Sequence, residues 1–241
     1  MHLKASRLLA SALAAALTCA AGAHDGCLRP ALAQKRAGRG TSHGVVYLAL
    51  GDSTGVGVGA ERGGYVERLF ARVERARPGS RLINLCASAA ATTDILREQV
   101  GRVPAARPTL ITVGVGANDL IRGVPAERFA HNYEEIIARL REENDAHILV
   151  MNIPDLALLP AVPAYMRDDA RRHILLFNER IGEVAKRYEL PVVDLYSRSR
   201  EFSSHPELFS RDGIHPSDAG YEFWAESVWP AMNKMLHEMP K

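Results

Sequence analysis

Cysteine is scarce in this chain, which has only Cys19, Cys27 and Cys86 among its 241 residues. Small exported domains that depend on disulfide bonds carry a larger, even set of cysteines. A disulfide framework is therefore excluded, and the stability of the fold must come from a hydrophobic core. One bridge between Cys27 and Cys86 stays open as an alternative, but we favour two unpaired thiols.

An excess of charge of one sign is also missing. The chain has 30 Lys and Arg residues against 28 Asp and Glu residues. Residues 1–23 hold two of the basic residues and none of the acidic ones, so the rest of the chain is formally neutral. Proteins that bind nucleic acid or anionic lipid surfaces usually carry a basic excess. The composition therefore predicts no nucleic-acid partner and no anionic membrane surface.

A long hydrophobic run occurs only at the N-terminus. Lys4 and Arg7 precede an Ala- and Leu-rich stretch, and Ala21-Gly22-Ala23 has the small-x-small pattern of a signal peptidase site. The stretch is short and poor in strongly apolar residues for a membrane span, which needs about 20 of them. We predict a signal peptide over residues 1–23 and a secreted or periplasmic protein without an integral membrane segment. An uncleaved anchor and a lipoprotein signal at Cys19 are the weaker alternatives.

The rest of the chain divides into a leader and one domain. Residues 24–43 are rich in Gly, Ala and Arg and have no apolar period, so we expect them to be a flexible leader. Residues 44–241 are enough to bury one good core and too few to require two domains.

Short, nearly continuous apolar runs recur along this domain and alternate with segments of helical period. Continuous apolar runs are typical of strands that are covered on both faces, as in a parallel sheet. We therefore predict an α/β fold, a three-layer α/β/α sandwich with a five-stranded parallel sheet. A last helix is expected to open at Pro216 and Ser217, with the proline in its first turn. The expected strands are 45–50, 81–85, 110–115, 147–151 and 191–195, and the helical stretches carry Tyr65, Leu69 and Val73, then Phe129 to Leu140, then Ile174 to Val184.

Three polar motifs follow expected strands. Gly51-Asp52-Ser53 follows the first strand, Gly116-Ala117-Asn118-Asp119 the third, and Asp212-Gly213-Ile214-His215 comes after the fifth and just before the last helix. Each motif alone is explained equally well by turn and capping residues. In an open α/β sheet, however, the reactive site lies at the carboxyl ends of the strands. The three motifs together, in this order, indicate an active site.

On these motifs the chain resembles the SGNH hydrolases, the GDSL-type esterases and lipases, from about Val45 to Trp229. The resemblance implies a flavodoxin-like fold, Ser53 as nucleophile, and Asp212 with His215 completing a triad. It also implies an oxyanion hole made by the backbone N–H groups of Ser53 and Ala89 and by the Asn118 side chain. Ala89 replaces the family's usual glycine; it keeps the N–H, but alanine does not tolerate every backbone conformation of glycine. Thr54 is a second departure, since the family more often has leucine there.

Acyl transfer explains why these residue types belong together. A serine hydroxyl becomes a good nucleophile when an imidazole accepts its proton, and a carboxylate orients that imidazole. Histidine suits the task because its ordinary pKa lies near neutrality. Amide donors stabilise the oxyanion of the tetrahedral intermediate. No step requires a metal or an organic cofactor, so we predict none.

Other interpretations of the same residues remain open at this stage. Gly51 to Gly55 also fits the GxSxG elbow of α/β-hydrolases, although that elbow follows several strands of its fold. Asp52, Asp119, Asp212 and His215 could be metal ligands of a phosphoesterase, which would leave Ser53 and Asn118 without a task. A catalytically inactive SGNH-like module that binds an acyl or glycan ligand is the alternative from another class. Asp119 is better explained as a supporting or loop-capping residue.

One segment bears on the substrate. Residues 152–166 form a long, apolar connection with several prolines after the fourth strand, and such connections are often functional. Leu156, Leu158 and Leu159 could line an acyl or aryl pocket, or simply pack on the core. Aromatic residues make up only 6% of the chain and form no evident sugar-stacking cluster, which favours acyl or aryl esters over polysaccharides. Thioesters and lysophospholipids are close variants. The sequence does not predict the oligomeric state.

Overall fold

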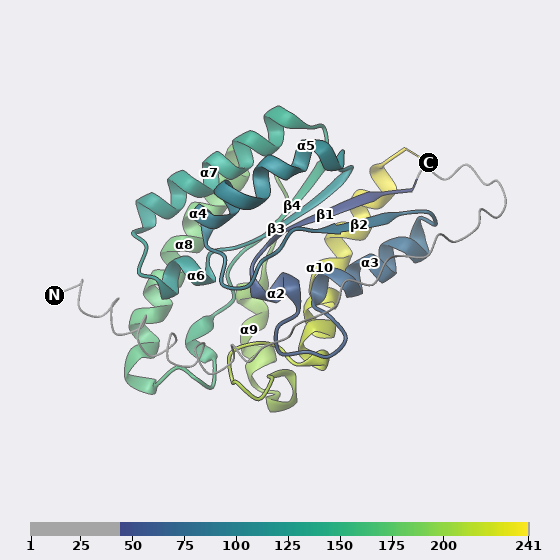
Figure 1. Cartoon of the computed structure of the whole chain (residues 1–241). Helices are drawn as coiled ribbons and strands as arrows, with labels where there is room; N and C mark the ends of the chain where they lie inside the picture. Colours follow the sequence, from purple (N-terminus) through teal and green to yellow (C-terminus); the bar gives the residue numbers. More distant parts are fainter. Residues whose placement is uncertain (1–43, 241) are drawn as a thin grey trace.

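Five parallel strands form one sheet at the centre of the computed structural model, which describes residues 44–240 (Figure 1). The strand order is β2-β1-β3-β4-β5, as expected for a flavodoxin-like α/β fold. The strands are β1 (Val46–Gly51), β2 (Arg81–Asn84), β3 (Leu110–Gly114), β4 (His147–Met151) and β5 (Val192–Val193). The expected signal peptide (1–23) and leader (24–43) lie outside the described residues.

The order of the strands creates one switch point. The chain runs from β1 to β2 on one side and then returns to place β3 on the other side of β1. A crevice opens beyond the carboxyl ends of the two strands on either side of such a point. Ser53 follows β1 and Asn118 follows β3, so the fold itself brings the first two motifs to this crevice.

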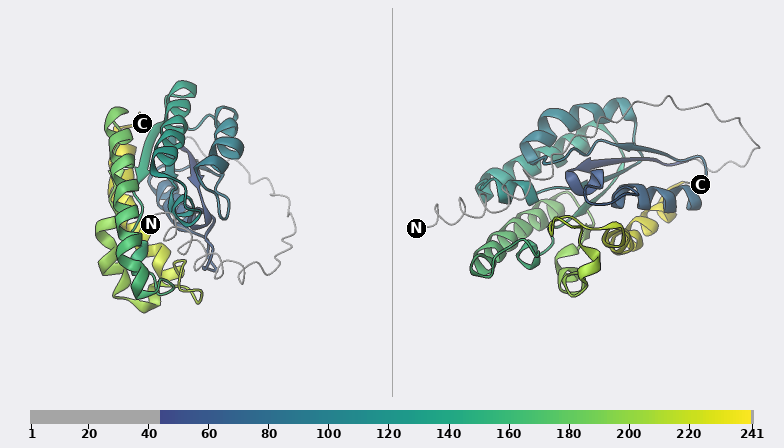
Figure 2. Two further views of the ribbon diagram at one scale, coloured as in Figure 1. Left: turned by 90° about the vertical axis from the view of Figure 1, so that its left-hand side faces the viewer. Right: turned by 60° about the horizontal axis from the view of Figure 1, so that its bottom comes forward.

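Helices cover both faces of the sheet, which explains the continuous apolar runs. In β1, the side chains of Leu48 and Leu50 enter one core, and those of Tyr47 and Ala49 enter the other. Figure 1 shows α3 and α10 on one side of the sheet and α7 on the other, and Figure 2 gives two further views of the layers. The helices are α2 (Ser53–Val56), α3 (Tyr65–Ala76), α4 (Thr92–Asp94), α5 (Val103–Ala106), α6 (Ala117–Ile121), α7 (Ala126–Glu143), α8 (Arg167–Arg187), α9 (Leu195–Ser203) and α10 (Asp218–Glu238).

Short helical turns join several of these elements. A π-helical turn, η1 (Ile95–Gln99), and a 3-10 turn, η2 (Val100–Arg102), connect α4 to α5. Further 3-10 turns are η3 (Leu156–Leu158), η4 (Ala164–Met166) and η5 (Pro206–Leu208). The first two of these three lie within the long connection after β4, which is therefore partly helical.

The fifth strand is shorter than the sequence predicted. Residues 191–195 were expected to be extended, but only Val192 and Val193 pair with β4. Asp194 then caps α9, because its side chain accepts a hydrogen bond from the Ser197 N–H (3.1 Å). The apolar Leu195 is the first buried residue of that helix and not the end of a strand.

The last helix also differs from its expected start. Ser217 is the N-cap, with its hydroxyl accepting from the Gly220 N–H (3.2 Å), and the helix begins at Asp218. Pro216 therefore lies before the cap and not in the first turn, so the prediction that the helix opens at Pro216 was wrong. A proline inside the helix, Pro230, did not prevent the helix from continuing to Glu238.

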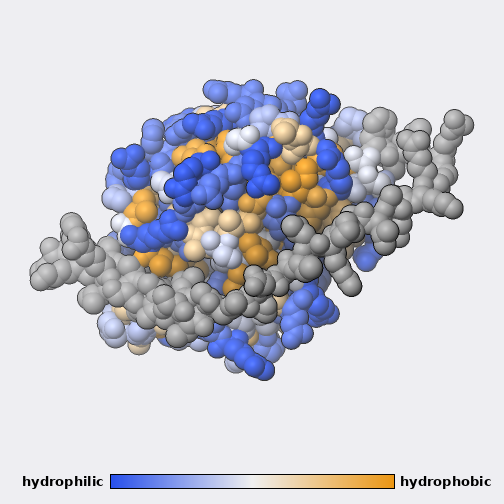
Figure 3. Space-filling model, in the orientation of Figure 1, coloured by the Kyte–Doolittle hydropathy of each residue, from blue (hydrophilic) through white to orange (hydrophobic). Residues whose placement is uncertain are grey.

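The surface of the described residues is mixed in character. Figure 3 shows hydrophobic patches bordered by hydrophilic residues on one face. The large hydrophobic side chains that are most exposed are scattered over the sequence: Val56, Tyr165, Leu175 and Val192. No helix within residues 44–240 has the length and apolar character needed to cross a membrane.

Candidate active site

Ser53 sits where β1 gives way to the short helix α2. Asp52 is the N-cap of that helix, and its Oδ1 accepts hydrogen bonds from the Thr54 N–H (2.9 Å) and the Thr54 hydroxyl (2.8 Å). This cap fixes the turn, so the Ser53 side chain is held at the end of the strand with 8% of the residue exposed. Thr54, which stands where the family more often has leucine, therefore has a structural role through its hydrogen bonds to Asp52.

The Ser53 hydroxyl is hydrogen-bonded to a histidine from the other end of the chain. Its Oγ lies 3.0 Å from Nε2 of His215, which is itself buried. On the opposite edge of the imidazole, Nδ1 lies 2.7 Å from Oδ2 of Asp212. The first and third motifs therefore form one continuous chain of hydrogen bonds.

Asp212 is held in place by donors on its second oxygen. Oδ1 accepts from the Ser210 hydroxyl (2.7 Å) and from the backbone N–H groups of Ile214 (2.8 Å) and His215 (2.9 Å). Partial burial works to raise the pKa of Asp212, but the hydrogen bonds from His215, Ile214 and Ser210 outweigh it and lower the pKa to about 2. The carboxylate is therefore ionised at any ordinary pH. Ser210 was not singled out from the sequence, although it lies only two residues before Asp212.

The third motif does not directly follow the fifth strand. Helix α9 and the turn η5 lie between β5 and residues 212–215. The loop is anchored instead by an isolated antiparallel bridge between Phe209 and Pro216 and by a hydrogen bond from the Ser210 N–H to the His215 carbonyl (2.8 Å). This small closed loop carries both Asp212 and His215 to the serine.

The candidate amide donors come from Ser53 itself, from the second motif and from the loop after β2. Asn118 is buried, and its Nδ2 donates to the Ala90 carbonyl (3.0 Å), which fixes the side-chain amide and leaves its second N–H available. The backbone N–H groups of Ser53 and Ala89 have no hydrogen-bond acceptor among residues 44–240. These are the three N–H groups that the family resemblance implies for the oxyanion hole.

Ala89 adopts the backbone conformation that the sequence put in question. Its φ angle is +60°, in the left-handed region that glycine tolerates and alanine rarely enters. The conformation is supported by Arg122, whose guanidinium donates to the Ala89 carbonyl (2.5 Å) and binds Asp94 (2.7 Å). The loop therefore keeps a glycine-like geometry without glycine, at some cost in strain.

Asp119 holds the same loop through two hydrogen bonds from Thr92. Its fully buried carboxylate accepts from the Thr92 N–H (3.0 Å) and the Thr92 hydroxyl (2.6 Å). Burial raises the pKa of Asp119, and the hydrogen bonds from Thr92 oppose that rise. Neighbouring residues of one motif thus hold neighbouring parts of one loop, since Asn118 binds Ala90 and Asp119 binds Thr92.

These partners bear on the metal-site interpretation. Asp52 caps α2, Asp119 binds Thr92, and Asp212 binds His215, so the carboxylates point to different partners. Among the described residues there is no group of three or more His, Cys, Asp or Glu side chains that could hold a metal ion. Cys86 packs beside α2 at the site; Cys27 lies outside the described residues, so their pairing stays an open alternative.

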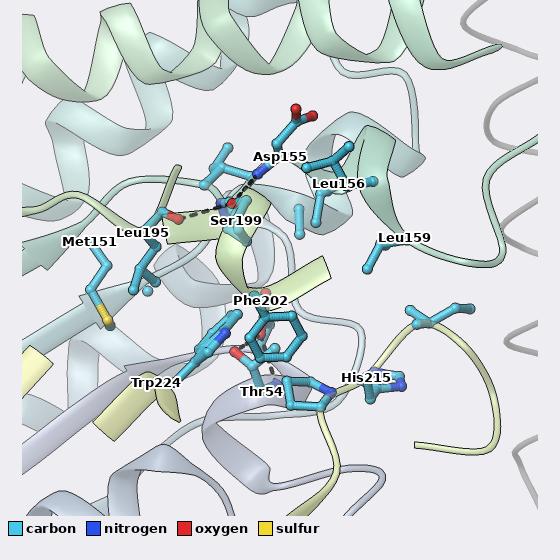
Figure 4. Close-up of a pocket in the computed structure, with 18 of the residues that line it drawn as sticks. Thr54, Met151, Asp155, Leu156, Leu159, Leu195, Ser199, Phe202, His215 and Trp224 are labelled. Atoms are coloured by element: carbon cyan, nitrogen blue, oxygen red, sulfur yellow. Dashed lines mark hydrogen bonds between the residues drawn. The ribbon is translucent and has the colours of Figure 1, made fainter. Parts of the chain in front are cut away.

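An apolar pocket opens beside the triad, with a free volume of about 110 Å³. Leu156, Leu158 and Leu159 all line it, and Leu156 and Leu159 also pack against the core, so both interpretations of this segment apply. Figure 4 shows Leu156 and Leu159 facing the same hollow as Phe202, Trp224 and His215.

Aromatic side chains gather at this pocket, contrary to the impression from the sequence. Phe202 contacts Phe209 and Phe223 edge to face, with ring centroids 5.0 and 5.4 Å apart. The ring centroids of Trp224 and Tyr65 are 6.0 Å apart. These five aromatic residues all line the pocket. Their spacing along the chain gave no signal, because α3, α9, α10 and the loop before residue 212 contribute them separately.

The fold and this site together define a hydrolase of the flavodoxin-like type, in which Ser53 directly follows the first strand of a parallel sheet. The comparison with known families agrees. Residues 49–223 match the GDSL-like Lipase/Acylhydrolase family, and the chain belongs to that family. It is a carboxylic-ester hydrolase of the GDSL/SGNH type. This family membership replaces the alternative interpretation of Gly51 to Gly55 as the GxSxG elbow of an α/β-hydrolase.

Individual relatives are distant but span the chain. Esterase TesA of Pseudomonas aeruginosa is 26% identical over 88% of this chain and 97% of its own length. Spore germination lipase LipC of Bacillus licheniformis is 28% identical over 76% of this chain and 93% of its own. The crystal structure of a lipase/acylhydrolase from Enterococcus faecalis superposes with a TM-score of 0.61 at 24% identity, covering 79% of this chain and 96% of that one, which supports the fold.

Proposed function

We propose that the protein is an exported serine esterase that hydrolyses acyl or aryl esters through an acyl-serine intermediate. The observation that carries this proposal is the chain of hydrogen bonds from Ser53 to His215 and from His215 to Asp212. Export rests on the sequence pattern of residues 1–23.

The reaction follows from the positions of the atoms. Nε2 of His215 accepts the proton of the Ser53 hydroxyl as Oγ attacks the ester carbonyl. Asp212 balances the charge of the imidazolium and keeps Nδ1 protonated. The imidazolium then gives its proton to the leaving alcohol, and a water molecule repeats the sequence to release the acid and regenerate Ser53.

The negative charge that develops on the carbonyl oxygen requires donors. The free N–H groups of Ser53 and Ala89 and the Asn118 amide would supply them. A single such donor typically contributes on the order of 3 kcal/mol to lowering the barrier. The hydrogen bond from the Asn118 amide to the Ala90 carbonyl fixes the positions of the Asn118 and Ala89 donors relative to each other, because Ala90 directly follows Ala89.

The pocket supports esters with an apolar acyl or alcohol chain. Its walls include several leucine and aromatic side chains. Thioesters and lysophospholipids remain possible substrates of the same machinery, since it acts on the acyl carbon and not on the leaving group. A catalytically inactive binding module is the alternative, and it would not need the intact triad.

Turnover of p-nitrophenyl acetate, butyrate and octanoate by the purified chain tests the proposal. We expect hydrolysis of all three, with Ser53→Ala reducing it by at least about a thousand-fold. Ser227→Ala is the matched control, because its hydroxyl binds the Phe223 carbonyl within α10, away from the triad. Binding of these esters without turnover would favour the inactive module.

A further inference from the structure

The pocket contains a buried hydroxyl that the proposed reaction does not use. Tyr65, the first residue of α3, is 1% exposed and lines the pocket. Its hydroxyl has no hydrogen-bond partner among residues 44–240. Burying a polar group without a partner is costly, so such a group in a native site calls for a ligand or a function.

The Tyr65 hydroxyl lies at the carboxyl end of the central strand. A Cβ atom added to Gly114 would stand 3.1 Å from this oxygen and 2.7 Å from the Met151 methyl group. Gly114 is the last residue of β3 and is in register with Gly51, two residues before Ser53. Gly114 also lines the pocket, so the phenol oxygen lies close to the pocket wall, next to the strand that carries Ser53.

A second polar residue, Asp52, lines the same pocket. Both hydrogen bonds to the Asp52 carboxylate reach Oδ1, so Oδ2 has no partner among the described residues. Burial raises the pKa of Tyr65, and the neighbouring Cys86, Tyr47 and Asp52 groups add to that rise. The phenol therefore keeps its proton and can donate a hydrogen bond, while Asp52 offers an acceptor nearby.

The walls around these two atoms are apolar. Met151, Leu195 and Trp224 line the same part of the pocket, and Figure 4 shows them with Phe202 around one hollow. An unsubstituted alkyl chain would make apolar contacts with the walls but would leave the Tyr65 hydroxyl without a hydrogen bond. An alcohol group on that chain would satisfy the phenol, because a hydroxyl can accept from Tyr65 and donate to a carboxylate at once.

We propose that Tyr65 is a specificity-determining residue whose hydroxyl binds a hydroxyl group on the chain of the ester substrate. This inference rests on the proposed esterase activity and names its substrate class as hydroxylated aliphatic esters. The hydroxyl group can belong to the acyl chain or to the alcohol chain, and the test separates the two.

The experiment compares matched esters by pH-stat titration of the released acid. Ethyl hexanoate is compared with ethyl 3-hydroxyhexanoate and ethyl 6-hydroxyhexanoate, and butyl hexanoate with 2-hydroxyethyl and 4-hydroxybutyl hexanoate. We expect at least one hydroxylated ester to exceed its parent by roughly five-fold or more in kcat/KM. A preference in the first set assigns the pocket to the acyl chain, and one in the second set assigns it to the alcohol.

Tyr65→Phe keeps the ring and removes only the hydroxyl, so it should bring that ratio close to one. Tyr133→Phe is the matched control: the Tyr133 hydroxyl is also buried without a partner, but it lies under α7 and does not line the pocket. It should leave the ratio unchanged. Neither variant should lower the melting temperature, because each loses an unpaired polar group.

Two results would overturn the inference. The first is a wild-type enzyme that prefers no hydroxylated ester, and the second is a ratio that Tyr65→Phe leaves unchanged, as an equal loss for all esters would do. Hydrolysis of ethyl hexanoate in the same assay keeps this failure distinct from failure of the esterase proposal, which would abolish turnover of every ester.

Discussion

Replacing Ala89 by glycine should stabilise the protein. An alanine at φ +60° carries strain of about 1–2 kcal/mol, which glycine does not. Glycine also lowers the free energy of unfolding by about 0.4–1 kcal/mol, because it gives the unfolded chain more conformational freedom. The midpoints of these two ranges differ by about 0.8 kcal/mol in favour of glycine, which corresponds to a rise of about 2–3 °C in the melting temperature of a domain of this size.

The activity of Ala89→Gly should stay within about three-fold of the wild type, because glycine presents the same backbone N–H to the oxyanion. Calorimetry and p-nitrophenyl butyrate turnover measure the two effects. Glu189→Gly is the matched control, since Glu189 also has a positive φ (+53°) but follows α8, away from the pocket. A lower melting temperature in Ala89→Gly, or a loss of activity beyond ten-fold, would refute the assigned backbone geometry.

Three further predictions concern the motif carboxylates and the histidine. Asp119→Ala should lower the free energy of unfolding by about 1–3 kcal/mol in urea titrations, because Thr92 loses the acceptors of the two hydrogen bonds that it donates; an unchanged midpoint would contradict the contact. The lowered pKa of Asp212 contributes stability that is complete above its unfolded value of 3.8 and is lost as the pH falls toward about 2. This contribution is at most about 2 kcal/mol, reduced by solvent because 21% of the side chain is exposed, and it should be missing from unfolding curves of Asp212→Asn. His215→Ala should reduce the hydrolysis of p-nitrophenyl butyrate by at least about a thousand-fold, because Ser53 loses its proton acceptor, and turnover that survives this change would count against His215 as the base.

The sequence predicted the sheet and the triad because each depends on local patterns. Continuous apolar runs indicated a doubly covered parallel sheet, and the motifs with Ser53 and Asn118 follow β1 and β3 as expected. The motif with His215 was expected directly after the fifth strand, but α9 and η5 come between them. Asp119 was expected to support the site, and its bonds to Thr92 fit that role. Ala89 was recognised as a departure from the family pattern, and its left-handed backbone gives that departure a physical meaning.

Other features depend on contacts between distant segments and left no local signal. The aromatic wall brings Phe202, Phe223 and Trp224 together only after α9 and α10 have packed. Tyr65 appeared in the sequence as one apolar residue of a helical period, and its unpaired hydroxyl is visible only in three dimensions. The two-residue β5 was overestimated because Leu195 is apolar in either a strand or a buried helix turn.

The central claim is that Ser53 is the nucleophile, and covalent labelling tests it most directly. The protein is treated with a fluorophosphonate and digested, and the modified peptide is located by mass spectrometry. We expect one phosphonyl group per chain on Ser53, with no labelling of Ser53→Ala and full labelling of Ser227→Ala. Labelling at another residue, or ester turnover that survives Ser53→Ala, would contradict the account.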